Sequence, residues 1–264
     1  MQDHEPTPLD RAHAAMTAAP EDDSARLRYF ARLADGMVWL WTEGEVMGTQ
    51  VRPQVFPTED GPVVLAFDSE ERLGQAAGAP VPYAAMPGRV VARALAGQGV
   101  ALGVNLGAEA PCFLVPPEAL DWLAATLDHA PQDAEARPLA FAAPADLPDV
   151  LLRALEEKLA RASGLALAAV MAGVTYEGGR RGHMLAFLDA APGAEAALAR
   201  AVSEALTFSG VEAGQLDVTF LKADAPAAAA ILRAGLRIDL PAPLDQPAAR
   251  APAPPGTQGP PRLR

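Results

Sequence analysis

The chain has one cysteine, Cys112, among 264 residues, so no disulfide can form within it. Cys112 stands between Pro111 and Phe113 in an apolar stretch, where a free cysteine usually behaves as a small hydrophobic residue. Histidines are scarce too, and the four at positions 4, 13, 129 and 183 lack the spacing of a zinc site. We therefore expect an unreactive thiol, no metal and no cofactor.

Long apolar runs are also missing. The longest candidates are short segments such as residues 165–174, whereas a membrane-spanning helix needs about 20 apolar residues. The first residues, 1–6, lack the basic and then apolar pattern of a secretory signal. The sequence thus predicts a soluble protein, and we expect a cytoplasmic location.

Positive charge is in deficit. The chain has 21 Lys and Arg against 33 Asp and Glu, which gives a formal net charge of −12. A polyanion would be repelled by such a chain and would release no counterions on contact. Nucleic acids and membranes are therefore not expected as partners, whereas a protein partner and a small-molecule ligand both stay open.

Catalytic and phosphate-binding motifs are missing as well. Gly97-Gln98-Gly99 precedes its predicted strand, whereas a dinucleotide-binding loop follows one, so we interpret it as a helix exit. Residues 99–120 are typical of strand, turn, strand and helix, with no catalytic group at the positions expected to be buried. We expect no enzymatic activity. A hydrolase or transferase would need an acid, a base or a nucleophile that only folding brings together.

What the chain does contain is enough apolar material for two cores, since 50% of its residues are hydrophobic and only 20% are charged. Its length suits two domains of about 100 to 150 residues each. We predict an α+β fold of two small domains, each a mainly antiparallel or mixed sheet with helices packed on it. The predicted boundaries are a helical arm at 1–20, a first domain at 21–128, a linker at 129–138, a second domain at 139–240 and a disordered tail, rich in Pro and Ala, at 241–264.

In the first half, Thr7 is predicted to cap a helix that Pro8 opens and that ends near residue 16. Asp68 and Glu71 have the spacing of a capping box at the start of another helix. Helical periodicity predicts buried faces at 27, 30, 31 and 34, at 90, 91, 94 and 95, and at 120, 123, 124 and 127. Strands are predicted at 37–42, 51–56 and 63–67, as an antiparallel meander with a turn at 58–61, and again at 100–105.

In the second half, the predicted order is helix, strand, strand, helix, strand, helix. Apolar spacing places a helix at 147–159, and alternation places a hairpin of strands 165–176 and 183–189 around a glycine-rich turn. A helix with apolar residues at 198, 202, 205 and 206, a strand at 216–220 and a helix opened by Asp224 and Pro226 complete it.

Several segments carry a family resemblance. They are residues 7–13 (TPLDRAH), 64–73 (VLAFDSEERL), 81–89 (VPYAAMPGR), 103–107 (GVNLG) and 116–123 (PPEALDWL), of which the last two are the most specific. The chain resembles the SseB family, bacterial cytoplasmic proteins named for enhanced serine sensitivity, over most of residues 7–240. Many members have Asn-Pro-Gly where this chain has Asn105-Leu106-Gly107. The resemblance implies two α+β domains, the second more divergent, and no established enzymatic activity.

Five residues are candidates for an interaction surface. Trp39 and Trp41 share one face of their strand, which is either a second covered face or an aromatic contact patch. Trp122 lies off the apolar stripe of its helix, so it packs on the second domain or anchors a partner. Arg180 and Arg181 lie at the hairpin tip, where they form a solvated turn or meet a phosphate or carboxylate.

Two functions follow as expectations. The first is a non-enzymatic, protein-binding adaptor or regulatory module, which the lack of a catalytic constellation and the off-stripe aromatic residues favour. The alternative is a regulatory domain that senses a small molecule related to serine, since small α+β domains often hold metabolites at the ends of their elements and the family name concerns serine.

Overall fold

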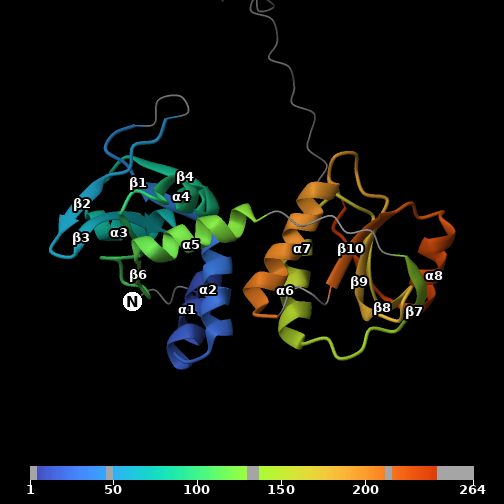
Figure 1. Cartoon of the computed structure of the whole chain (residues 1–264). Coiled ribbons are helices and arrows are strands. Elements are labelled where there is room, and N and C mark those ends of the chain that lie inside the picture. The colour runs from blue at the N-terminus through green and yellow to red at the C-terminus, as the bar shows by residue number, and fades with distance from the viewer. Residues whose placement is uncertain (1–4, 46–49, 130–136, 212–215, 243–264) are drawn as a thin grey trace, which may run out of the picture.

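The computed structural model describes residues 5–45, 50–129, 137–211 and 216–242. Within these ranges the chain forms two α+β units that lie side by side, as Figure 1 shows from blue to green and from yellow-green to red. The predicted fold class is confirmed. Most of the predicted linker, and the predicted tail from 243 onward, lie outside the described residues.

The first unit runs from the N-terminal helices to the helix that precedes the second unit. Its elements are α1 (Pro8–Ala18), α2 (Asp23–Asp35), β1 (Met37–Trp41), β2 (Val55–Thr58), β3 (Gly61–Phe67), α3 (Glu70–Ala77), β4 (Tyr83–Pro87), α4 (Gly88–Leu95), β5 (Ala101–Val104), β6 (Phe113–Val115) and α5 (Pro117–Asp128). Its sheet has the order β4-β1-β3-β5-β6, with β2 beside β3. β3 and β5 pair in parallel, and the other strand pairs described for this sheet are antiparallel, so the sheet is mixed.

The predicted meander of the first three strands is wrong. The hairpin of β2 and β3 forms around the predicted turn, with Thr58 opposite Gly61. However, β2 covers only the first half of β3. The second half is therefore free to pair with β1, which places Trp39 opposite Phe67.

Residues at the N-terminal ends of α1 and α3 connect α1 to the sheet. Thr7 caps α1 as predicted, because its hydroxyl accepts a hydrogen bond from the Asp10 amide at 3.1 Å. The cap of α3 is Ser69 and not Asp68. The Asp68 carboxylate instead accepts hydrogen bonds from the Thr7 hydroxyl and the Arg72 guanidinium, both at 2.6 Å. Asp68 therefore joins α1 to α3 across the end of β3.

The sequence predicts the buried face of one helix correctly and those of two others only in part. The buried face of α5 is the predicted one, and the predicted face of α2 misses the buried Tyr29 and Leu33. In α4 the predicted Val90 is 45% exposed. Gly88 and Ala92 are buried in its place, because these small residues let α4 approach α2, where the Gly88 amide donates to the Gly36 carbonyl at 2.9 Å.

The second unit has two strands that the sequence did not predict. Its elements are β7 (Pro138–Ala142), α6 (Asp149–Leu159), β8 (Ala168–Tyr176), β9 (Arg181–Leu188), α7 (Glu195–Ser209), β10 (Leu216–Leu221), α8 (Pro226–Ala234) and β11 (Leu236–Asp239). The predicted hairpin of β8 and β9 is confirmed, and β10 pairs with β9 in parallel. The unpredicted β7 and β11 both pair with the other edge of β8.

The helices of the second unit cover both faces of its sheet. Residues of α6 and α7 form the core on one face, and α8 covers the other. Figure 1 shows that α6 and α7 face the first unit, whereas α8 lies on the far side. No helix among the residues that the structure describes is long and apolar enough to cross a membrane.

Candidate functional site

The two units meet along a contact that we call the interdomain seam. Here α2 and α5 of the first unit pack on α7 of the second, and ion pairs add α4 on one side and α6 on the other. Its apolar part is Phe208 of α7, which is 2% exposed and belongs to the core of the first unit. The ring of Trp122 packs edge to face on Phe208, with centroids 6.2 Å apart, and on Phe30. An aromatic side chain of the second unit thus fills a place in the first.

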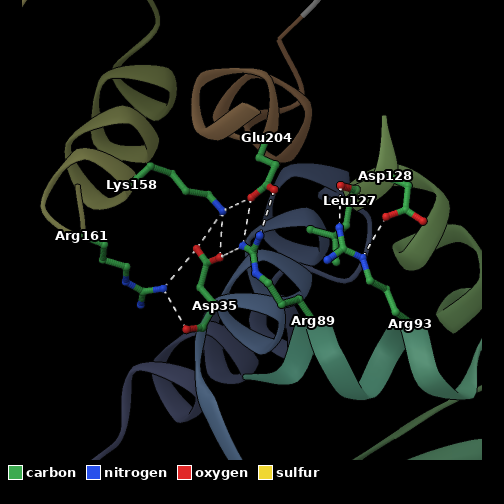
Figure 2. Close-up of polar contacts among 8 residues, drawn as sticks. All are labelled: Asp35, Arg89, Arg93, Leu127, Asp128, Lys158, Arg161 and Glu204. Atoms are coloured by element: carbon green, nitrogen blue, oxygen red, sulfur yellow. Dashed lines mark hydrogen bonds and ion pairs between the residues drawn. The ribbon is translucent and has the colours of Figure 1, made fainter. Parts of the chain in front are cut away.

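Beside this contact lies a group of charged residues that we call the seam cluster: Asp35, Arg89, Lys158, Arg161 and Glu204 (Figure 2). Lys158 Nζ lies 2.8 Å from an Asp35 carboxylate oxygen and 2.6 Å from one of Glu204. Arg89 donates from both terminal nitrogens to the two Glu204 oxygens, each at 3.1 Å, and also pairs with Asp35. Each unit therefore contributes one carboxylate, and cations from both units bind it.

The cluster is largely closed to solvent. The side chains of Glu204, Lys158 and Asp35 are 4%, 9% and 11% exposed. Arg161 forms the outer wall at 48% exposure, where it donates to the Asp35 carbonyl at 3.0 Å and lies 3.3 Å from the carboxylate. Buried charges must be paired to be tolerated, and here each is.

The surrounding charges keep Asp35 ionised. Burial alone would raise the pKa of Asp35, but the charges of Lys158, Arg89 and Arg161 outweigh this effect and lower that pKa. For Arg89, burial would lower the pKa, but the hydrogen bonds and charges of Glu204 and Asp35 raise it. At neutral pH, Asp35 is therefore a fixed negative charge and cannot act as a proton donor.

Two further ion pairs support the seam. Arg32 of α2 pairs with Glu157 of α6 across it. Within the first unit, Arg93 of α4 binds the Asp128 carboxylate at 2.8 Å and the Leu127 carbonyl at 3.1 Å, as Figure 2 shows. This bond holds α4, and with it the neighbouring Arg89, against α5.

Two hollows flank the seam, and cations outnumber carboxylates in both. The larger, of about 500 Å³, is lined by the seam cluster, Arg200 and apolar residues of α7. The other, of about 330 Å³, lies between α1 and α2 on one side and α6 and α7 on the other, and its charged lining residues are Arg11, Arg28, Arg32, Asp35, Glu157 and Lys158. This excess of positive charge contrasts with the net charge of −12 of the whole chain.

Comparison with known families settles what the first unit is. Residues 9–122 match the family described as SseB protein N-terminal domain. The first unit therefore contains an SseB N-terminal domain. The matched SseB domain runs from α1 into α5, so it includes Asp35 and Arg89 of the seam cluster. No curated protein and no solved structure gives a significant match. The kinship of residues 139–240 to the second domain of the family stays a prediction.

The tryptophans of the SseB domain lie in two places. Trp122 is 39% exposed at the seam, beside Phe208. Trp39 and Trp41 are half-buried on one face of β1, and the Trp41 ring packs edge to face on Phe56 with centroids 5.3 Å apart. Trp39 also lines a hollow of about 220 Å³ with Arg161 of the second unit. Trp122 and Trp39 therefore each lie near a residue of the second unit.

The predicted arginines lie elsewhere, at the tip of the second unit's hairpin. The Arg180 guanidinium stacks 4.0 Å above the centre of the Tyr176 ring and pairs with Asp217 at 3.0 Å. Burial, followed by the hydrogen bond to Asp217, raises the pKa of Tyr176. Arg181 begins β9 and is exposed. Arg180 therefore already has a carboxylate partner.

The structure also shows where the cysteine and two of the histidines lie. Cys112 is exposed just before β6, so it does not lie in an apolar strand as the sequence suggested. The segment from Gly107 to Cys112 forms a surface loop instead of continuing the strand. Among the described residues no group of three His, Cys, Asp or Glu could hold a metal ion. His13 packs against the Tyr29 and Phe113 rings, and a His183 ring nitrogen lies 2.8 Å from the Ala145 carbonyl oxygen.

Sequence reasoning missed the seam cluster altogether. Its members are far apart in the chain, and each resembles an ordinary surface charge on a helix. One signal was available, because Glu204 lies next to the predicted apolar face of α7 and is buried with it. A buried glutamate requires a cationic partner, although the sequence does not identify which one.

Proposed function

We propose that this protein is a non-enzymatic binding protein with a regulatory role, in which the seam makes the two domains respond as one unit. The observation that carries this proposal is the sharing of Lys158 and Arg89 between Asp35 of one domain and Glu204 of the other. A cytoplasmic location remains part of the proposal.

The chemistry of the cluster favours binding over catalysis. Its carboxylates accept hydrogen bonds from Lys158 and Arg89, and the lowered pKa of Asp35 keeps that group charged at neutral pH. A general acid or base needs a pKa near the working pH. Groups held ionised in this way serve to hold structure and to recognise charge.

The same cluster favours regulation. A buried ion cluster is stable only in a narrow range of geometries, because separated partners leave buried charges uncompensated. The two domains therefore have a closed arrangement that a competing charged group can disturb. Such an element, whose balance a bound molecule shifts, is what a regulatory protein requires.

Domain coupling can be tested with the natural cysteine. Cys112 is exposed in the first domain, and Arg233→Cys on α8 supplies a second exposed site in the second domain. With spin labels at both, we expect one narrow distance distribution, which broadens when Glu204→Ala is added. Asp239→Ala removes an exposed carboxylate and serves as the control. An equally narrow distribution in the Glu204 variant would contradict the coupling.

The regulatory role needs a second measurement, made in the native cell. We expect wild type and Asp239→Ala to recover the same stoichiometric partner, and Glu204→Ala to recover at least several-fold less of it. Equal recovery by all three forms would argue against regulation through the seam.

A second candidate function is a protein-binding adaptor that uses the aromatic face of β1 and β4. Met37, Trp39 and Trp41 point to one side of β1, and Tyr83 lies opposite Trp41 on the same side. Met37 and Tyr83 are 47% and 37% exposed. The acidic chain favours a basic partner that covers this face.

The adaptor function predicts a loss confined to this face. In Trp41→Ala we expect a specific basic partner to be lost from affinity purifications, while Val90→Ala, an exposed change on α4, retains it. Thermal unfolding of both variants checks that they fold. Retention of the partner by the Trp41 variant would exclude this face as its site.

A further inference from the structure

The larger hollow at the seam has more positive than negative charge. Arg89, Lys158, Arg161 and Arg200 line it together with two carboxylates, Asp35 and Glu204. The chain as a whole carries a net charge of −12, so a local excess of cations is unusual for this protein. Concave sites of one charge sign concentrate small ions of the opposite sign.

The cations of the hollow are not equally engaged. Lys158 and Arg89 are bound by both carboxylates and are mostly buried. Arg161 is half exposed, and Asp35 is its one ion-pair partner among the residues that the structure describes. Arg200 lies one turn before Glu204 on α7, is exposed, and makes no ion pair or hydrogen bond with any residue in the described ranges. Arg161 and Arg200 therefore have donors left for a ligand.

We propose that this hollow binds a small organic dianion, a phosphomonoester or a dicarboxylate, through the guanidinium groups of Arg161 and Arg200. Arginine suits both groups because its planar fork forms two parallel hydrogen bonds to their oxygens. The excess of two positive charges in the lining matches the charge of a dianion. This inference rests on the proposed function, since it names the class of molecule that the seam responds to.

The size and walls of the hollow fit an organic ligand better than a bare ion. Its volume of about 500 Å³ lies within the range of small-molecule sites, roughly 300–1,000 Å³. Leu165, Ala196 and Ala201 provide apolar wall for the carbon skeleton of a ligand. A dianion placed here would also compete with Asp35 for Arg161, which connects the site to the seam cluster.

Calorimetry of the full chain tests the site with three probes: inorganic phosphate, glycerol 3-phosphate and succinate, each at millimolar concentration. We expect saturable heat from an organic dianion, and at least about tenfold weaker binding in Arg200→Ala, because charge-assisted hydrogen bonds are lost. Arg233→Ala, an exposed arginine on the far face of the second domain, is the matched control and should bind as wild type.

The three probes separate the sources of the anion. Binding of glycerol 3-phosphate without succinate assigns a phosphomonoester, and the reverse assigns a dicarboxylate. No heat from any probe, or equal affinity in Arg200→Ala and wild type, overturns the site.

The spin-label distances keep this result apart from the proposed function, because they need no ligand. If no probe binds but the spin-label distance distribution still broadens in Glu204→Ala, only the ligand site is rejected. If a probe binds in an Arg200-dependent way but Glu204→Ala leaves the distance distribution unchanged, only the domain coupling is rejected.

Discussion

Replacing Glu204 by alanine should weaken the link between the two domains more than the loss of any exposed ion pair would. The carboxylate is 4% exposed and accepts one hydrogen bond from Lys158 and two from Arg89. Removing one partner of a buried pair costs about 3–5 kcal/mol. Because Asp35 stays in place to bind both cations, we expect the lower end, about 3 kcal/mol. Asp239→Ala, in an exposed pair with Arg237, should cost less than about 1 kcal/mol.

The positions of the tryptophans make the assay specific. All three, Trp39, Trp41 and Trp122, lie in the first domain, so tryptophan fluorescence follows the unfolding of that domain. Far-UV circular dichroism follows helices of both domains. In urea we expect the two signals to give coincident transitions for wild type, because the seam couples the domains.

In Glu204→Ala the two transitions should separate, and at least one midpoint should fall. Coincident transitions at the wild-type midpoint would refute the reasoning, since the buried carboxylate would then contribute nothing to the coupling. Separated transitions already in wild type would show that the seam is too weak to couple the domains.

Three further predictions concern the surroundings of the cluster. In Gly88→Ala the new Cβ would overlap the Leu33 carbonyl oxygen, so we expect a loss of about 1–3 kcal/mol in the free energy of unfolding and a lower thermal midpoint. In the control Gly74→Ala the new Cβ meets open space in α3, so the midpoint should rise slightly. Because the pKa of Asp35 is lowered by folding, its contribution is complete above its ordinary value of 3.8 and is lost as the pH falls through the lowered one. Separation of the fluorescence and dichroism transitions should therefore appear in acid, and Asp35→Asn should show it at neutral pH. Arg72→Met leaves the nearly buried Asp10 and Asp68 without their cation and should cost about 2–4 kcal/mol in urea unfolding, and an unchanged midpoint would show that Thr7 alone suffices.

Local patterns predicted those elements whose own residues determine them. The buried face of α5 was predicted correctly because its apolar residues recur at helical spacing: Leu120, Leu123, Ala124 and Leu127. The hairpin of β8 and β9 was correct because a glycine-rich turn separates two apolar strands. In α4 the same reasoning failed, since Gly88 and Ala92 bury little surface yet decide which side meets α2.

Tertiary pairing accounts for what local patterns missed. Leu236 to Asp239 is too short to show alternation and becomes a strand only through its bonds to β8. The Asp68 cap was wrong because Arg72 and Thr7 bind its carboxylate more favourably than a helix amide would. The seam cluster joins residues 35, 89, 158, 161 and 204, a proximity that no spacing in one sequence reveals.

The outer edge of β8 is divided between two short strands that run in the same direction. β7 pairs with residues 173–176 and β11 with residues 168–171, so the chain enters and leaves this edge near its middle. A Cβ at Gly173 would lie 3.2 Å from the Ala143 carbonyl oxygen, and one at Gly235 would lie 2.7 Å from that of Met171, so both junctions are tight. A foreign strand would find no more than a few consecutive unpaired peptide groups there. On this side of the sheet, the broken edge therefore offers little for edge-to-edge aggregation.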